Sequence, residues 1–477
     1  MADNLKEKTA KGLLWGGLNS GFGQLLGLLF GIVLGRLLSP EDYGMMAMIA
    51  IFSLVANELQ NSGFKVALAN LREPRPEDYN SVFWTNILIG VVLYVVLFAL
   101  APLIAAYYHE PRLTPLARYA FLGFVFASFG TAQSAYLFKN LRAKQQAKAA
   151  MTAVLLSSTV GVVMAYMGYS YWSLATQTNL YILTCTLLYW HYSDWRPTLK
   201  IDLGPARRMF RFSCKLLLSS VVTDVNSNLL NILLGRFYTV RDAGNYNQAY
   251  QWNYKASYLI QGMMAQVAQP VLVDVQDERE RQLRVLRKMV RFAAFVAFPL
   301  LLGFSLVARE FIVLAIGEKW LESARLLQVL CVGGAFAPLS VVLFNVLLSK
   351  GKSTTYMWSN IVLCVVQVGV MTLLRPYGIR PMVVAFTAVG IVWFFVWWAC
   401  VRRLVGYRLA MLLADVLPFG LVAAGVMALT GWATSGIGSL WLLLAVRVAM
   451  AALLYVAVMK VARVEILDEC LKFLMKK

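Results

Sequence analysis

GRLLSPEDYG, residues 35–44, returns as GRFYTVRDAG at residues 235–244. The two copies share a Gly-Arg pair, an aspartate and a closing glycine at the same positions. In each copy an apolar segment ends in Leu-Gly-Arg, a polar turn follows, and the glycine opens the next predicted helix. Two unrelated helix ends with similar turn chemistry would give the same match, so the surrounding segments must decide whether this is a repeat.

The composition is that of an integral membrane protein. Of the 477 residues 60% are hydrophobic and 14% are charged, and the mean hydropathy is +0.64. Soluble domains carry about 25% charged residues. The apolar residues form continuous blocks of about 20 residues, the length of a membrane-crossing helix, and do not alternate as in a β-barrel. We therefore predict an all-α integral membrane protein with about fourteen transmembrane helices.

The order of the apolar blocks answers the question of the repeat. They fall at 13–38, 43–63, 81–107, 115–138, 149–169, 172–192, 212–235, 244–268, 289–307, 322–348, 355–374, 378–401, 411–431 and 436–460. Each copy of the phrase follows the first block of a set of six. We predict two pseudo-symmetric six-helix lobes, residues 1–200 and 201–405, inserted the same way up as parallel repeats. Residues 406–477 add two transmembrane helices and a tail.

Lysine and arginine are distributed unevenly along these blocks. With the amino terminus in the cytoplasm, 32 of the 44 basic residues lie on the cytoplasmic side, as the positive-inside rule requires. Ten lie on the other side, Arg36 and Arg236 among them, and Lys255 and Arg447 lie within helices. The bias predicts that both termini are cytoplasmic. The same bias indicates that the net charge of +20 orients the protein in the membrane and contacts anionic lipids, and does not bind nucleic acid.

Two predicted helices carry polar residues that a lipid-facing surface would not tolerate. Asp224 and Asn228 in one helix, and Asn247, Gln251 and Lys255 in the next, recur every three or four residues and so share a helix face. Lys255 lies about eleven residues into its helix, near the middle of the bilayer at 1.5 Å per residue. Polar groups at that depth indicate a cavity or a helix interface. We assign all five residues to a substrate cavity.

The first lobe offers fewer such residues. Gln24 stands at the repeat position of Asp224, and Glu58 is an acidic residue within the second block. We add both to the candidate cavity, with Arg36 and Arg236 at its outer rim. Interhelical hydrogen bonds, or a buried pair of Lys255 with Asp224 or Glu58, would give these residues a structural role instead. The sequence leaves both interpretations open.

The sequence lacks the signatures of enzymes and metal sites. It has no Gly-rich phosphate loop, no nucleophile elbow and no H-E-x-x-H motif. Its six cysteines form no C-x-x-C pair, and only two histidines could add imidazole ligands, which argues against a zinc site or a disulfide framework. We therefore expect no catalytic residues, no metal and no cofactor.

Five stretches follow a known pattern. They are GRLLSPEDYGMMAMIAIF at 35–52, NSGFKVALA at 61–69, EDYNSVFWTN at 77–86, MGYSYWSLA at 167–175 and NLLNILLGRFYTVRDAGNYNQAY at 228–250. These stretches resemble the polysaccharide transporter family of Wzx-type oligosaccharide flippases, and within it the branch of colanic acid and teichuronic acid exporters. The resemblance covers residues 10–260 well and continues only in hydropathy beyond them.

The resemblance implies membership of the multidrug/oligosaccharidyl-lipid/polysaccharide exporter superfamily, with two six-helix lobes and, in many flippases of lipid-linked substrates, two additional helices. It implies that a polyprenyl-pyrophosphate-linked oligosaccharide crosses the bacterial cytoplasmic (inner) membrane by alternating access, for O-antigen, capsule or exopolysaccharide synthesis. The implied partners are this substrate, membrane lipids, and the polysaccharide polymerase and glycosyltransferases of the same pathway. Family cavities are often cationic. In this chain Lys255 stands against two acidic residues, Glu58 and Asp224, which is a departure from that pattern.

Two other functions stay open. A cation-coupled exporter of small molecules or drugs from the same superfamily would typically lack the last two helices and carry more acidic residues in its first lobe. A membrane enzyme of polysaccharide assembly would be expected to carry a large external loop or a soluble catalytic domain, and the sequence shows neither. The block count and the polar helix faces favour the flippase.

Overall fold

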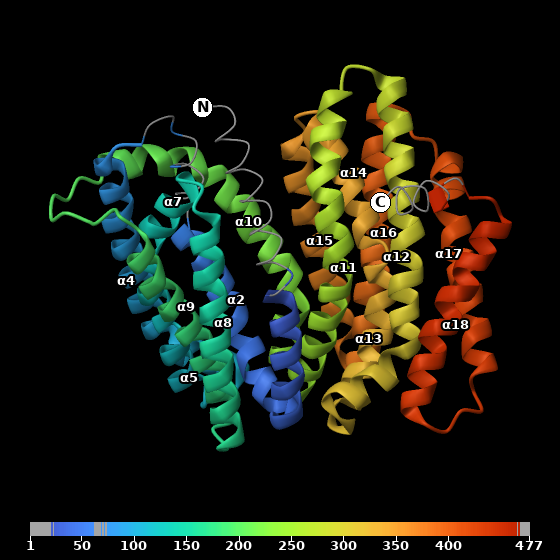
Figure 1. The fold of residues 1–477 in the computed structure, drawn as a ribbon, viewed down its shortest axis with the longest axis horizontal. Coiled ribbons are helices and arrows are strands. Elements are labelled where there is room, and N and C mark those ends of the chain that lie inside the picture. Colours follow the sequence, from blue (N-terminus) through green and yellow to red (C-terminus); the bar gives the residue numbers. More distant parts are fainter. Residues whose placement is uncertain are drawn as a thin grey trace. The chain divides into compact units, whose positions relative to one another are not determined.

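The computed structural model describes residues 21, 23–61, 68, 71, 74–464, 466 and 467, without side-chain detail at residues 61, 206–220 and 222. Within this part every regular element is a helix, which confirms the prediction of an all-α protein. The chain forms two compact units, unit 1 (Met1–Gly244) and unit 2 (Asn245–Lys477). The helix α11 begins in unit 1 and continues through unit 2 (Figure 1).

Unit 1 is built from the helices of the first half of the chain. After a helical segment Gly23–Leu37, they are α2 (Pro40–Asn61), α4 (Pro76–Tyr108), α5 (Leu113–Ala120), α6 (Leu122–Ser128), α7 (Thr131–Lys139), α8 (Ala143–Tyr166), α9 (Tyr171–Tyr192) and α10 (Gly204–Phe237). The helices α8 and α9 pack along each other, and α10 packs on α2 and α4.

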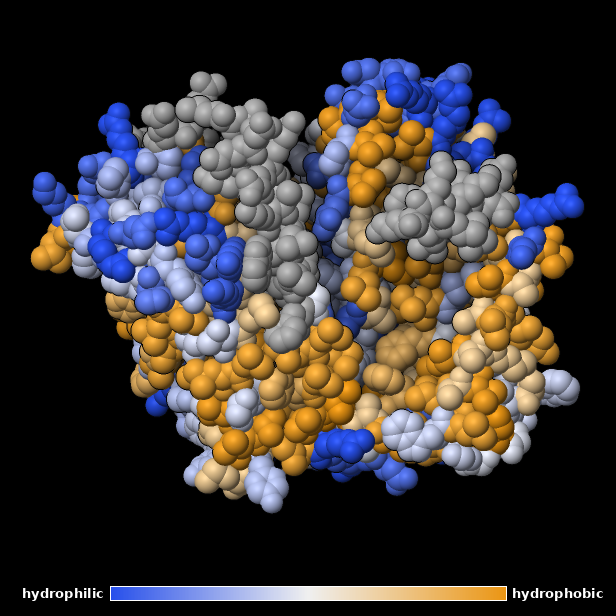
Figure 2. Space-filling view, viewed as in Figure 1, coloured by the Kyte–Doolittle hydropathy of each residue, from blue (hydrophilic) through white to orange (hydrophobic). Residues whose placement is uncertain are grey.

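Unit 2 is built on the two longest helices. Its elements are α11 (Val240–Asp274), α12 (Arg279–Ile316), α13 (Leu321–Gly334), α14 (Ala337–Ser349), α15 (Ser353–Leu374), α16 (Ile379–Val405), α17 (Leu409–Ala433) and α18 (Leu440–Val461), with short 3-10 turns at Glu318–Trp320 and Arg375–Tyr377. At 38 residues α12 is about 57 Å long. It therefore extends beyond a hydrocarbon core of about 30 Å. Figure 2 shows hydrophobic residues over the middle of unit 2 and hydrophilic residues over the tip between α11 and α12.

The chain is a multi-pass membrane protein, but the number of spans is not settled at fourteen. Nine helices of the described part are long and apolar enough to cross a membrane, or ten if a bent pair is one span. Within the described residues, each predicted block from 43–63 onward overlaps one helix or a run of two or three consecutive helices. The first block, 13–38, lies partly outside the described residues. The helices α9 and α11 are not among the nine because hydroxyl, amide and aromatic side chains lower their hydropathy.

The fourth predicted span of each half is a broken helix. In unit 1 the helices α5 and α6 meet α7 at a bend of 44°. Across that break, the indole of Trp190 donates to the carbonyl of Phe129 at 2.7 Å, and the hydroxyl of Thr186 donates to Phe126 at 3.0 Å. These bonds satisfy carbonyls near the bend, as an apolar environment requires. In unit 2 the break separates α13 from α14.

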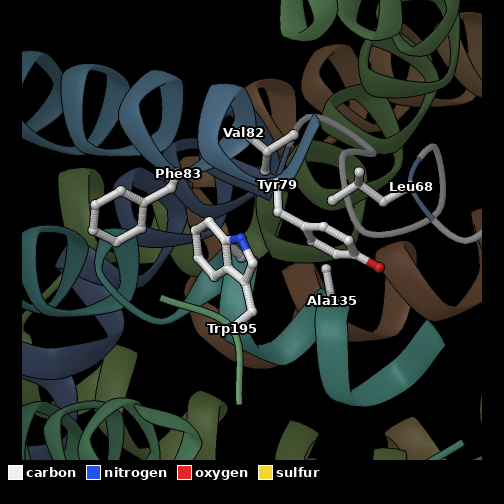
Figure 3. Packing of buried hydrophobic residues seen from close by; sticks show 7 residues of the cluster. Leu68, Tyr79, Val82, Phe83, Ala135 and Trp195 are labelled. Carbon is white, nitrogen blue, oxygen red and sulfur yellow. The ribbon is translucent and has the colours of Figure 1, made fainter. Parts of the chain in front are cut away.

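One end of unit 1 is held by a cluster of buried aromatic and aliphatic side chains (Figure 3). Phe83 of α4 packs edge to face on Trp195, with ring centroids 6.0 Å apart, and Tyr79 lies 5.9 Å from the same indole. Large aromatic pairs of this kind stabilise beyond their buried area by about 1 kcal/mol each. They fix the segment between α9 and α10 against α4.

The last two helices form a pair that packs on α12, shown in orange-red beside it in Figure 1. Phe419 of α17 meets Phe295 of α12 edge to face at 6.1 Å, and Tyr455 of α18 donates its hydroxyl to the carbonyl of Phe295 at 3.0 Å. The pair is therefore an integral part of unit 2 and not a loosely attached tail.

Candidate functional site

Both copies of the repeated phrase begin a helix in the same way. The hydroxyl of Ser39 donates to Asp42 Oδ2 at 2.9 Å, and the hydroxyl of Thr239 donates to Asp242 Oδ2 at 2.8 Å. The backbone amides of both aspartates donate back to these hydroxyl groups. This capping box satisfies amides that a helix start leaves without intrahelical partners.

The closing glycines of the two copies lie where the helix starts cross. Because α2 begins at Pro40 and α11 at Val240, Gly44 and Gly244 lie one turn inside their helices. The prediction that the glycines open these helices is therefore wrong, since the caps start them earlier. A Cβ on Gly44 would lie 1.9 Å from the carbonyl oxygen of Val240, and one on Gly244 would lie 1.8 Å from that of Pro40. Only glycine permits this backbone contact.

The crossing is reciprocal in sequence. The first residue of each helix contacts the glycine of the other helix: Val240 contacts Gly44, and Pro40 contacts Gly244. The next residue of each helix also pairs with its counterpart, since Arg241 lies 3.8 Å from Glu41. A local two-fold relation between the copies gives this pattern. The two copies of the phrase therefore contact each other directly at their helix starts. Symmetry between whole lobes stays a prediction.

The two rim arginines have different surroundings. The guanidinium of Arg236 donates to the carbonyl of Tyr107, contacts the ring of His109, and lies 5.0 Å from the centroid of the Tyr107 ring. Arg36 is exposed. Arg236 thus holds the end of α4 in place, and part of its donor capacity is already used there.

An acidic group lies in the same loop. Arg112 donates to both carboxylate oxygens of Glu110, at 2.7 and 2.8 Å. This hydrogen bonding lowers the pKa of Glu110 below its ordinary value, so the side chain stays an anion at neutral pH. The loop after α4 therefore combines charges of both signs and is not uniformly cationic.

The polar face of α10 is partly covered within unit 1. Asp224 and Asn228 are half-buried, and the amide of Asn228 donates to the backbone carbonyl of Asp224 at 3.1 Å. One further turn on, Asn231 is 3% exposed and belongs to the core. Of the two remaining unit 1 candidates, Glu58 is half-buried on α2 and Gln24 is exposed. The structure brings Asp224 and Asn228 together and leaves Gln24 outside the packed interior.

The helix α11 has a polar face that unit 2 does not bury. Gln251 is exposed, Asn247 and Lys255 are half-buried, and the side chains of Tyr254 and Tyr258 are 42% and 47% exposed. These two tyrosines stack with centroids 5.3 Å apart. One side of α11 therefore carries all of these side chains, as the spacing of Asn247, Gln251 and Lys255 in the sequence predicts.

Lys255 has an aromatic neighbour. Its ammonium lies 4.8 Å from the ring centroid of Trp252, a cation–π contact that is stronger in a desolvated site than in water. Within the described part of unit 2 the ammonium forms no ion pair. Asp224 and Glu58, its suggested partners, belong to unit 1, and the pairing stays a prediction.

Unit 2 contains a buried ion cluster that the sequence did not predict. Asp415 of α17 is fully buried and accepts two hydrogen bonds from Arg287 of α12, at 2.8 and 3.0 Å, and one from Arg291 at 2.5 Å. The hydroxyl of Tyr407 also donates to it, at 3.0 Å. A single aspartate within an apolar block was the available signal, because a charge at that position requires partners.

A second buried pair joins α18 to α12. Arg447 donates to Glu310 at 2.9 Å and to the hydroxyl of Thr434 at 3.1 Å. Glu310 is 3% exposed. Arg447 therefore has a structural role outside the candidate cavity. The described residues contain no group of three metal-ligating side chains.

A family of known proteins matches this chain. The family model described as polysaccharide biosynthesis protein aligns with residues 33–325, which is more than half of the sequence. This chain belongs to that family. The matched residues include α2 through α12, and hence the repeat crossing and both polar helix faces.

Curated proteins of polysaccharide synthesis are similar to this chain. The chain is 27% identical to the lipopolysaccharide biosynthesis protein WzxC of Escherichia coli strain K12, over 73% of this chain and 71% of the relative. It is 27% identical to the teichuronic acid biosynthesis protein TuaB of Bacillus subtilis strain 168, over 69% of each. It is 22% identical to the succinoglycan biosynthesis transport protein ExoT of Rhizobium meliloti, over 81% and 76%.

Solved structures share the fold. The lipid II flippase MurJ in an inward closed conformation matches 95% of this chain and 99% of its own, with a TM-score of 0.75 and 12% identity. An inward-facing multidrug resistance transporter of the MATE family matches 80% and 94%, with a TM-score of 0.63 and 17% identity. This polysaccharide biosynthesis protein therefore has the fold of the MOP superfamily.

Proposed function

We propose that the protein is a flippase that moves a polyprenyl-pyrophosphate-linked oligosaccharide across the bacterial inner membrane by alternating access, for the synthesis of a surface polysaccharide. The observation that supports this most is the polar face of α11 with Lys255, which unit 2 leaves uncovered. Family membership and the transport relatives support the substrate class. Polysaccharide polymerase and glycosyltransferases of the same pathway are the partners we propose.

The chemistry of such a substrate explains why a polar helix face is needed. A sugar pyrophosphate cannot enter hydrocarbon unaided, because an unpaired buried charge costs many kcal/mol. A polar cavity can hold the head group while the polyprenyl chain stays in lipid. Outward movement of an anion is favoured by an inside-negative potential, by about 2.3 kcal/mol per charge per 100 mV. In this proposal Lys255 meets the phosphate as a compact cation, and Asn247 and Gln251 bind polar groups beside it.

We further propose that both termini face the cytoplasm, as the distribution of basic residues indicates. Ser435 and Lys352 are exposed in loops that would lie on opposite sides. In intact cells an impermeant maleimide should label a cysteine at position 435 and spare one at position 352. Labelling at position 352 and not at position 435 would show that the orientation is the opposite of the proposed one.

Substitution of Lys255 tests the site. Lys255→Met keeps the length of the side chain and removes its charge, so we expect normal insertion and folding with a loss of glycan export. Lys255→Arg should keep part of the export, because a cation remains at the same depth. The measurement is surface glycan in a strain that lacks the chromosomal copy of the protein, complemented at matched expression.

A matched control is Lys460→Met, which removes an exposed lysine at the end of α18. It should leave export unchanged. If Lys255→Met also exports at the wild-type rate, Lys255 has a structural role and the proposed site is wrong.

A further inference from the structure

Unit 2 contains an open cavity of about 320 Å³ lined by residues of α11, α13, α14, α15 and α16. This is near the lower limit for small-molecule sites. Its lining combines aromatic rings with amide and hydroxyl groups, and none of the lining residues is charged. From α11 it is lined by Tyr250, Asn253 and Gln261, and not by Asn247, Gln251 or Lys255. The cavity is therefore distinct from the face that carries Lys255.

Three polar atoms of this cavity lack partners. Asn253 Oδ1, Gln367 Oε1 and Thr387 Oγ1 are buried and form no hydrogen bond within the described part of the chain. The three residues are 9%, 4% and 8% exposed, and they come from α11, α15 and α16. Buried polar atoms are almost always hydrogen-bonded. In this structure neighbouring atoms close these three atoms off from the open cavity, so a ligand with hydrogen-bonding groups pairs with them only after a rotation of their side chains.

Aromatic rings form the rest of the wall. Trp393 and Trp397 lie one turn apart on α16, and both line the cavity. Trp393 is fixed by a hydrogen bond from its ring nitrogen to the hydroxyl of Ser359 at 3.1 Å, and Trp397 stacks on Tyr356 with centroids 5.6 Å apart and a 24° angle between rings. These indoles are held in place before any ligand enters, which lowers the entropy cost of binding.

We propose that this cavity binds an uncharged sugar ring of the transported glycan. A pyranose presents hydroxyl groups at its edge to the unpaired amide and hydroxyl atoms, and apolar C–H groups on its face to the indoles. A phosphate would require arginine or lysine, and an alkyl chain would leave the buried polar atoms unsatisfied. This inference rests on the proposed function, since it assigns to unit 2 a glycan-binding site separate from the phosphate site.

Gly390 allows the cavity to be filled without disturbing its walls. It lines the cavity, and a Cβ built on it meets no atom within 4 Å. Gly369 on α15 also meets none and is exposed, as Gly390 is, but it does not line the cavity. We therefore compare Gly390→Leu with Gly369→Leu as its control. Gln367→Leu removes one unpaired amide at nearly constant volume.

The probes are methyl β-D-glucopyranoside, methyl β-D-galactopyranoside and methyl α-L-fucopyranoside, measured by saturation-transfer NMR with the full-length protein in lipid nanodiscs free of sugar detergents. We expect transfer to at least one glycoside. Gly390→Leu and Gln367→Leu should weaken its binding about tenfold, the effect of 1.4 kcal/mol, and Gly369→Leu should not. Gln367→Leu should melt no lower than wild type, because it removes an unpaired buried amide.

Several results would overturn the inference. They are the absence of transfer to all three glycosides, equal binding by Gly390→Leu and wild type, or displacement of the glycoside by cyclohexanol at equal concentration, which would indicate a merely apolar cavity. The assay contains no lipid carrier and no membrane crossing. A negative result in this binding assay therefore does not refute the proposed function. Sugar binding by a protein that flips no lipid would refute the proposed function and leave the sugar site standing.

Discussion

Alanine at Gly44 or Gly244 should greatly reduce the yield of folded protein. The added Cβ would lie within 2 Å of a backbone carbonyl oxygen, at 1.9 Å for Gly44 and 1.8 Å for Gly244. A backbone atom cannot rotate away as a side chain can, so the two helix starts must separate. We expect a loss of about 3 kcal/mol or more in stability. The measurement is the folded fraction recovered by size-exclusion chromatography, together with the apparent melting temperature.

The control for this substitution is Gly425→Ala in α17. A Cβ at that position meets no atom within 4 Å, so it should be neutral or stabilising by up to about 1 kcal/mol through helix propensity. Because the contact is reciprocal, the double substitution at positions 44 and 244 should cost less than the sum of the two single substitutions. Folding and melting of Gly44→Ala equal to those of Gly425→Ala would refute the close crossing.

Asp415→Asn should release the last two helices from α12. The carboxylate is fully buried and binds Arg287, Arg291 and Tyr407. Removing one partner of a buried ion pair costs about 3–5 kcal/mol. We expect the lower part of this range, because the side chains of the two arginines are 30% and 41% exposed and can be hydrated. Limited trypsin digestion should then cut faster at Arg408, next to α17, and the melting temperature should fall.

An exposed ion pair provides the comparison for this variant. Arg281 and Glu278 lie 2.9 Å apart with side chains 52% and 60% exposed, and such a pair contributes less than about 1 kcal/mol. Glu278→Gln should therefore change neither the digestion pattern nor the melting temperature. If Asp415→Asn behaves in the same way, the cluster does not hold the helix pair.

The features that the sequence predicted are those with a local or periodic signal. The helix faces with Asp224 and Asn228, and with Gln251 and Lys255, follow from the spacing of the residues alone. The repeated phrase predicted a repeated structure, but its role was hidden because the glycines matter only in contact with Val240 and Pro40. A contact between segments 200 residues apart leaves no mark in either segment by itself.

The features that the sequence did not predict depend on partners far along the chain. Asp415 is paired with residues 124 and 128 positions away, and a lone aspartate in an apolar block does not name its partner. The polar atoms of the cavity in unit 2 come from three helices, and each of them has the appearance of an ordinary membrane-helix residue in the sequence. The aromatic stretch at 394–398 has a composition typical of residues that face lipid or another helix, and the structure places Trp397 in the cavity wall.

The most direct test of the central claim is flipping by the purified protein alone. A fluorescent polyprenyl-pyrophosphate-linked disaccharide is incorporated into both leaflets of liposomes with or without the protein, and a membrane-impermeant quencher is added outside. We predict that wild-type protein lets the quencher reach nearly all of the labelled lipid, whereas in protein-free liposomes and with Lys255→Met only the outer leaflet is quenched. If folded wild-type protein gives the same quenching as protein-free liposomes, the protein does not flip this class of lipid and the account is contradicted.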